Sequence, residues 1–451
     1  MIDENHTQDL YAKHVKIQNR WVDGFYQNIR SVMIWVTLSV FFLAPWLTWN
    51  GRQAILFDIT TRKFYLFNLT FWPQDFHLLL LLVISAALSL IVITTLAGRV
   101  WCGYTCPQTV WTKCYMWIEY MTEGDRGKRL KRDKNPWEIS TLSRRALKHA
   151  LWLLLALITA MCFVGYFFPI YDVVIFDISW WGISWIIFFT LATYVNAGWM
   201  REQVCLYICP YARFQSVMFD SNTLVISYDH KRGEPRGSLK EDLGRKKLGS
   251  CIDCQLCVQV CPTGIDIREG LQMACIGCAA CVDACDSVMD KVNFPRGLIR
   301  YDTENNIEGK KTRIIRPRLI ASVLLLGVIF SIFLALLFTR VPLQLNAVHD
   351  HRNLYRLTAN GEIENAYVLS VSNMDQDSQL LSIEVKGLDN FKYIGPKDIS
   401  LSPGESTEIP VTLTVDKNSI RSFNTPISFV IQNINDPEMV AKSDANFFSS
   451  Q

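Results

Sequence analysis

The sequence has few histidines and, in its last third, no cysteine. Of the seven histidines, only His77 and His149 lie beside long apolar runs, each near an edge. A transmembrane haem pair needs histidine ligands within the helices, so haem-mediated electron transfer across a bilayer is disfavoured. No glycine-rich dinucleotide fingerprint follows a strand and opens a helix, which argues against an NAD or flavin domain. The polar, acidic start lacks the pattern of a cleavable signal.

Half of the residues are hydrophobic, and the long apolar runs contain almost no ionisable side chain. The absence of intramembrane charge disfavours ion or proton pumping. Each run is close to the ~20 residues that cross the hydrocarbon layer. They predict five membrane helices, at about 32–49, 77–97, 149–169, 180–198 and 319–338.

The distribution of lysine and arginine predicts the orientation of these helices. Segments 98–148 and 199–318 are rich in both residues, whereas 170–179 has neither. The positive-inside rule then places the N-terminus and both basic segments in the cytoplasm and the C-terminus in the periplasm. The basic run 126–134 is better suited to fixing topology and contacting anionic lipid than to binding nucleic acid.

Eight of the 14 cysteines form two copies of one spacing. They read Cys251-x₂-Cys254-x₂-Cys257-x₃-Cys261-Pro262 and Cys275-x₂-Cys278-x₂-Cys281-x₃-Cys285-Asp286. This is the bacterial ferredoxin spacing, in which three close cysteines bind one cluster and the fourth binds its neighbour. We therefore expect two [4Fe–4S] clusters, one on Cys251, Cys254, Cys257 and Cys285, the other on Cys275, Cys278, Cys281 and Cys261. Zinc would favour paired knuckles, and disulfides would need an oxidising compartment. Asp286 replaces the second proline, which we expect to alter the turn without removing a ligand.

Four further cysteines lie in two copies of Cys-x-Tyr-x-Cys-Pro, each just after an even-numbered predicted membrane helix. A pair of helices followed by such a loop thus occurs twice, as in an internal parallel repeat. If the halves pack about a pseudo-twofold axis, the four thiols converge at the membrane surface; they are Cys102, Cys106, Cys205 and Cys209. Four sulfur ligands suit Cu(I), a further Fe–S cluster or zinc. The alternative is that they are unmetallated packing residues. Cys114 is a candidate spare ligand, and Cys162 a packing residue.

Beyond the fifth run the hydrophobic period becomes that of half-buried strands. The alternating positions are Tyr367, Leu369 and Val371, then Ile383 and Val385, then Ile409, Val411, Leu413 and Val415, then Ile427, Phe429 and Ile431. Such strands, separated by turn signals, predict an immunoglobulin-like β-sandwich, which we expect to serve binding or assembly. Pro410 favours an edge position. His349 and His351 suit a solvated juxtamembrane turn better than a metal site.

The predicted fold is therefore a multidomain one, with a polytopic α-helical membrane domain, an inserted two-cluster ferredoxin domain and an all-β immunoglobulin-like sandwich. The predicted parts are a cytoplasmic N-terminal segment (1–30), a four-helix membrane domain with both Cys-x₃-Cys-Pro loops (31–240), the ferredoxin-like domain (241–300), a linker with the fifth span (301–340) and the sandwich (341–451).

From about residue 30 onward, this combination of motifs resembles the FixG/RdxA/CcoG family. The resemblance implies an accessory protein for biogenesis of the cbb-type cytochrome c oxidase in the bacterial cytoplasmic membrane. It implies a cupric reductase that supplies Cu(I) for the copper centre of the oxidase. Expected partners are membrane lipid, copper ions, a copper chaperone or transporter, oxidase assembly factors and a cytoplasmic electron donor whose identity stays open. A dimer is compatible with this interpretation, and nucleic acid is not an expected partner.

Two other functions remain open at this level. The chain could be a membrane relay that oxidises quinol and passes electrons to a periplasmic reductase, because related membrane ferredoxins share the Cys-x₃-Cys-Pro loops. It could also be a scaffold whose clusters only hold the fold together. Reduction of Cu(II) by the protein would distinguish the cupric reductase from both the quinol relay and the scaffold.

Overall fold

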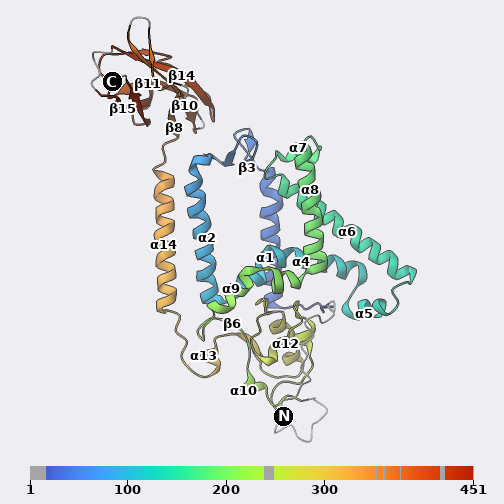
Figure 1. The fold of residues 1–451 in the computed structure, drawn as a ribbon. Coiled ribbons are helices and arrows are strands. Elements are labelled where there is room, and N and C mark those ends of the chain that lie inside the picture. The colour runs from blue at the N-terminus through green and yellow to red at the C-terminus, as the bar shows by residue number, and fades with distance from the viewer. Residues whose placement is uncertain are drawn as a thin grey trace, which may run out of the picture. The chain divides into compact units, whose positions relative to one another are not determined.

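The computed structural model describes residues 17–237, 248–350, 353–358, 361–375, 377–416 and 422–449. The chain divides into two compact units, one formed by Met1–Trp46 and Val83–Ile329, the other by Leu47–Leu82 and Phe330–Gln451. Figure 1 shows the elements of both in chain order. The redox motifs all lie in the first unit, and the β-sandwich lies in the second.

Among the residues that the structure describes, five helices are long and apolar enough to cross a membrane, as the sequence predicts. They are built on α1 (Phe25–Leu43), α2 (Phe76–Ala97), α6 (Ile139–Val164), α8 (Trp180–Thr193) and α14 (Pro317–Phe338). The fourth span, Trp180–Met200, includes the π-helical turn that follows α8. Large apolar side chains on their outer faces are exposed, among them Val36, Leu153, Phe188 and Leu324. In a bilayer, lipid covers such faces.

Two membrane helices begin earlier in the chain than the apolar runs predict. α1 begins at Phe25 because the carboxylate of Asp283 accepts hydrogen bonds from the backbone N–H groups of Tyr26 and Gln27, at 3.1 and 2.7 Å. α6 begins at Ile139, inside the basic segment. A hydropathy pattern does not register such polar extensions of a helix.

The first unit also contains further helices, most of them within the segments that the sequence pattern treats as loops; those at Ala44–Trp46 and Tyr194–Met200 overlap the ranges predicted as membrane helices. The further helices are η1 (Ala44–Trp46), α3 (Val100–Tyr104), α4 (Pro107–Glu123), α5 (Arg126–Lys134), α7 (Ile170–Val174), the π-helical turns η3 (Tyr194–Met200) and η4 (Val204–Ile208), and α9 (Pro210–Met218). Pro107 and Pro210 occupy the first turns of α4 and α9, where the missing N–H of proline removes no helical bond. Each Cys-x₃-Cys-Pro motif therefore ends by starting a helix.

The ferredoxin-like part is closed by two antiparallel strands, β6 (Val225–Tyr228) and β7 (Ile299–Asp302). Its helices are α10 (His230–Gly233), α11 (Leu256–Gln259), η6 (Ile267–Glu269) and α12 (Ala280–Lys291), with α13 (Glu304–Ile307) following β7. Since β6 precedes residue 241, this part begins earlier than the predicted boundary. Asp286 lies inside α12, so the chain makes no turn there; its carboxylate accepts the N–H of Gly297 at 2.9 Å.

The second unit contains the predicted sandwich, made of two antiparallel sheets. One has the order β12-β14-β10-β8, with β9 paired to β10, and the other has the order β13-β11-β15-β16. The strands are β8 (Leu343–His349), β9 (Arg356–Leu357), β10 (Ile363–Asn373), β11 (Gln379–Lys386), β12 (Phe391–Ile394), β13 (Asp398–Leu401), β14 (Ser406–Val415), β15 (Asn424–Asn433) and β16 (Val440–Phe448). The alternating residues found in the sequence form its core, with Leu369, Leu413 and Phe429 fully buried.

Two predictions about this sandwich need correction. Pro410 lies on β14, which is an inner strand. The ladder between β12 and β14 covers only Thr412–Val415, so Pro410 has a strand neighbour on one side alone and displaces no ladder bond there. His349 does not lie in a solvated turn: it ends β8, and its Nε2 lies 3.0 Å from Oδ1 of Asn365. His351 lies outside the described residues.

Small strands and a short helix precede α2 in the same unit: β1 (Thr48–Trp49), β2 (Arg52–Gln53), β3 (Ile55–Asp58), β4 (Lys63–Leu66), β5 (Leu69–Phe71) and η2 (Pro73–Asp75). Two cations join this segment to the sandwich side of the unit. Lys63 donates to the carbonyl of Gly404 at 2.7 Å, and Arg340 pairs with Asp75 at 2.6 Å. Both cations therefore have partners within their own unit.

Candidate redox centres

The eight ferredoxin cysteines line two small cavities in the sets that the spacing predicts. Cys251, Cys254, Cys257 and Cys285 line one. Cys261, Cys275, Cys278 and Cys281 line the other, with Cys257 at its edge. The crossover of the fourth cysteine of each motif is thus present in the fold. This donor set fits two cubic clusters held by four thiolates each.

Several of the ferredoxin cysteines are buried thiols. Among the described residues, no three His, Cys, Asp or Glu side chains converge closely enough to hold a single metal ion. Burial raises the pKa of Cys257 to about 11 and the pKa values of Cys275 and Cys285 to about 12. Such thiols keep their protons until a metal replaces them, which is how folding and metal binding are coupled in thiolate sites.

The structure brings the four cysteines of the two Cys-x₃-Cys-Pro loops together. Three neighbouring cysteines raise the pKa of Cys102 by charge repulsion; they are Cys106, Cys205 and Cys209. Cys209 also raises the pKa of Cys106. Burial raises the pKa of Cys102 to about 12 and that of Cys205 to about 11, with Arg99 acting in the opposite direction on both. Cys114 lies on α4 beside Lys113, and Cys162 is buried in α6.

Hydrogen bonds between the two loop regions hold this arrangement. Sγ of Cys102 donates to Oε1 of Gln215 on α9 at 3.4 Å, and Arg99 donates to the carbonyl of Ala212 at 2.5 Å. In the other direction, Nε2 of Gln108 donates to the carbonyls of Asn196 and Arg201, at 2.9 and 3.1 Å. Each repeat therefore fixes the other, as expected of paired halves.

The thiol loops also touch the cysteine loop of the second ferredoxin motif. A Cβ added to Gly103 would lie 2.8 Å from the carbonyl oxygen of Gly277 and 3.0 Å from Cα of Cys278. Arg99 donates to the carbonyl of Cys275 at 3.1 Å, and Tyr301 donates to that of Gly277 at 2.5 Å. At Gly103, backbone contact this close leaves no room for a side chain.

A buried ion-pair network lies under the second thiol loop, and sequence analysis did not find it. Glu119 on α4 is fully buried and accepts from Arg129 at 3.1 Å and from Arg201 at 2.9 Å, with Lys148 at 4.0 Å. Lys148 also pairs with Glu123 at 2.7 Å. Arg201 has a φ of 44°, an uncommon backbone conformation for a side-chain-bearing residue. The available signal was an acidic residue between Trp117 and Tyr120 of α4.

Comparisons with known proteins agree with this organisation. The family described as a 4Fe–4S dicluster domain matches residues 200–304, and a 4Fe–4S binding domain family matches residues 79–129. The immunoglobulin-like fold at the C-terminus of FixG matches residues 333–450. The first two matches include both thiol loops as well as the ferredoxin cassette.

Whole-chain relatives carry the same names. The chain is 32% identical over 478 residues to the nitrogen fixation protein FixG of Rhizobium meliloti, covering 94% of this chain and 91% of that protein. It is 38% identical over 404 residues to RdxB of Cereibacter sphaeroides, covering 85% and 84%. It is 37% identical over 400 residues to RdxA of the same organism, covering 84% of each. The chain is thus a membrane oxidoreductase with 4Fe–4S domains and an electron-transfer role, and it belongs to the FixG/RdxA family.

Proposed function

We propose that this protein reduces Cu(II) to Cu(I) at the thiol site formed by Cys102, Cys106, Cys205 and Cys209, and supplies the product for the copper centre of a cbb-type oxidase. The observation that carries the proposal is the backbone contact of Gly103 with Gly277 and Cys278. It supports an arrangement in which the thiol loop of Cys102 lies beside a ferredoxin cysteine. That arrangement suits one-electron reduction of a metal held at the thiols.

The thiols suit the product of this reaction better than its substrate. Thiolate sulfur is a soft ligand, which favours Cu(I) over the harder Cu(II). Because Cu(I) is stable with two or three thiolates, it needs no preformed four-ligand site. The raised pKa values of Cys102 and Cys205 mean that copper binding displaces protons from these side chains.

When bound, the 4Fe–4S clusters supply electrons one at a time. The chain holds the two cysteine motifs in contact through Gly103, Gly277 and the side chains of Arg99 and Tyr301. The basic segments around the motifs support a cytoplasmic position for these groups, with the β-sandwich in the periplasm. The sandwich would then be available to an oxidase or a copper chaperone.

The test is anaerobic Cu(II) reduction by the purified, chemically reduced protein, followed by a Cu(I)-specific chromophore. We expect Cys205→Ser and Cys209→Ser to abolish rapid reduction while the iron and sulfide content stays at the wild-type level. Cys162→Ala removes a cysteine outside the site and should leave the rate unchanged. Wild-type rates in the serine variants would refute the proposal, and cluster reduction by quinol that is independent of copper would favour a quinol relay.

A second pair of variants tests the contact itself. Gly103→Ala pushes a methyl group against backbone atoms, which cannot move aside as a flexible side chain can. Gly127→Ala is the matched control, because nothing lies within 4 Å of its added Cβ. We expect the first variant to slow copper reduction with its iron content intact and the second to behave as the wild type. Equal rates would show that the contact is not used.

A further inference from the structure

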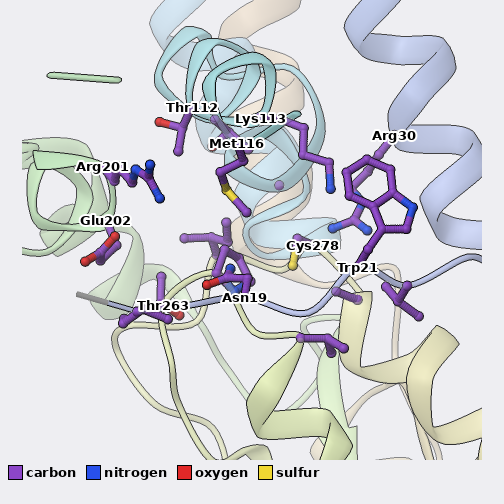
Figure 2. A pocket seen from close by; sticks show the side chains of 18 of the residues that line it. Asn19, Trp21, Arg30, Thr112, Lys113, Met116, Arg201, Glu202, Thr263 and Cys278 are labelled. Carbon is purple, nitrogen blue, oxygen red and sulfur yellow. The ribbon is translucent and has the colours of Figure 1, made fainter. Parts of the chain in front are cut away.

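A cavity in the first unit lies between the two kinds of redox motif. Its wall includes Cys205 from a thiol loop and Cys278 from the second ferredoxin motif, together with Gly103. Figure 2 shows Lys113, Arg30 and Trp21 grouped beside Cys278, with Arg201 and Glu202 across the cavity. A ligand in this cavity would therefore lie against both the site of proposed copper binding and the adjoining cysteine motif.

The cavity wall is strongly cationic. Five cations line it, and Glu202 is the lining acid; the cations are Arg20, Arg30, Lys113, Arg129 and Arg201. Arg129 and Arg201 share one counter-charge, since both pair with Glu119 behind the wall, so the two guanidinium charges are only partly compensated. The charges of Arg30 and Lys113 are not matched in this way.

Arg30 and Lys113 lie close enough to repel each other. Arg30 is 6% exposed; it contacts the side-chain oxygen of Gln27, and its Nε is buried without a hydrogen-bond partner. Among the described residues Lys113 forms no ion pair, and its Nζ lies 4.1 Å from the centre of the Trp21 ring. Burial and Arg30 lower the pKa of Lys113 to about 8. Asp23 acts on Lys113 from outside the cavity lining, and its carboxylate accepts from Trp21.

Two buried cations facing each other are favourable when an anion lies between them. Both side chains can donate several charge-assisted hydrogen bonds to carboxylate oxygens. The same cavity offers sulfur at Cys205 and at the thioether of Met116. A bare Cu(II) cation would be repelled by this wall, whereas a copper complex carrying net negative charge would be attracted to it.

We propose that this cavity receives copper as an anionic carboxylate chelate, with the carboxylates bound between Arg30 and Lys113 and the metal facing Cys205. This rests on the proposed copper reduction and specifies its substrate class. Copper gains one electron from the reduced protein and exchanges carboxylate oxygen for thiolate sulfur. The carboxylate anion leaves with its charge unchanged, and the displaced thiol protons go to solvent.

The first experiment measures binding without turnover, using oxalate free of copper and isothermal titration calorimetry on the cluster-loaded protein. Losing one charged donor should weaken binding at least about tenfold in Lys113→Gln, while Lys113→Arg keeps most of the affinity. Lys131→Gln, an exposed lysine on the basic run, is the control and should bind as the wild type. No oxalate binding by the wild type, or undiminished binding in Lys113→Gln, overturns the inference.

The second experiment measures single-turnover reduction of two bis-chelates with the same ring size, the dianionic Cu(II)–oxalate complex and the neutral Cu(II)–glycinate complex. The ratio of wild-type to Lys113→Gln rates should be about tenfold for the first and close to one for the second. Equal ratios would mean that the cationic pair only compensates the charge of the neighbouring cysteine centre, and the inference fails. If neither complex is reduced by the wild type, the proposed function itself fails.

Discussion

Removing the buried carboxylate under the second thiol loop should loosen that loop selectively. Glu119 is fully buried and holds Arg129 and Arg201 at 3.1 and 2.9 Å. Glu119→Gln leaves these cations in the interior without a counter-charge, which typically costs about 3–5 kcal/mol. Arg201 begins the segment that leads to Cys205, and its φ of 44° depends on surrounding contacts to persist.

Hydrogen–deuterium exchange of a peptide spanning 198–209 measures this effect directly. If the substitution lowers the free energy of local opening by about 3 kcal/mol, the open population and the exchange rate rise by roughly 100-fold. A peptide from α12 should exchange as in the wild type, because the ion-pair partners Arg129 and Arg201 lie outside that helix. The loop cysteines should also lose their fixed geometry, so copper reduction should slow.

The control is an ion pair of the same type at the surface. Asp133 pairs with Arg145 at 2.6 Å, with the two side chains 45% and 29% exposed. Such pairs contribute about 0–1 kcal/mol, so Asp133→Asn should leave exchange near the thiol loop unchanged. The reasoning is refuted if Glu119→Gln and Asp133→Asn give the same exchange rates across 198–209.

Three further substitutions test other parts of the fold. Asp283→Ala removes the acceptor for two N–H groups at the start of α1, so exchange there should rise by the equivalent of about 1–2 kcal/mol, and Asp283→Asn should restore part of it. Asp286→Pro puts a proline inside α12, costing about 3 kcal/mol or more, and should lower the iron content, unlike Asp286→Ala. The N–H of Ser402 lowers the pKa of Glu405 below its ordinary 4.5. Glu405→Gln should therefore have a smaller free energy of unfolding than the wild type at pH 7, and this difference should vanish as the pH falls and the carboxyl of the wild type is protonated.

The sequence predicts those features that depend on residues close together in the chain or on composition. The cysteine sets follow from spacings of two and three residues, and the five helices follow from the length of apolar runs. The sandwich follows from a period of two, with Leu369 and Phe429 buried as that pattern requires. In each case the determining residues lie within one element or one motif.

The features that the sequence does not predict depend on pairs of residues far apart. Asp283 extends α1 from a position 257 residues away, and β6 begins the ferredoxin-like part because it pairs with β7. A burial pattern likewise shows that β14 is a strand but not that β12 stops short of Pro410. Local propensity contains no information about such partners, so the element types are right while their ends are not.

The close approach of the two cysteine motifs explains why each contains a glycine beside a cysteine. Gly277 has a φ of +69°, which L side chains rarely adopt, and it packs on the carbonyl of Arg99; Gly103 packs on Gly277 in return. A side chain at either position would separate the backbones by its own width. The pair therefore does what neither motif accomplishes alone: it joins a thiol loop at the end of a membrane helix to a ferredoxin loop without an intervening layer. The contact shortens the path between a ferredoxin cysteine and the thiol loop, which is the arrangement that the proposed copper reduction uses.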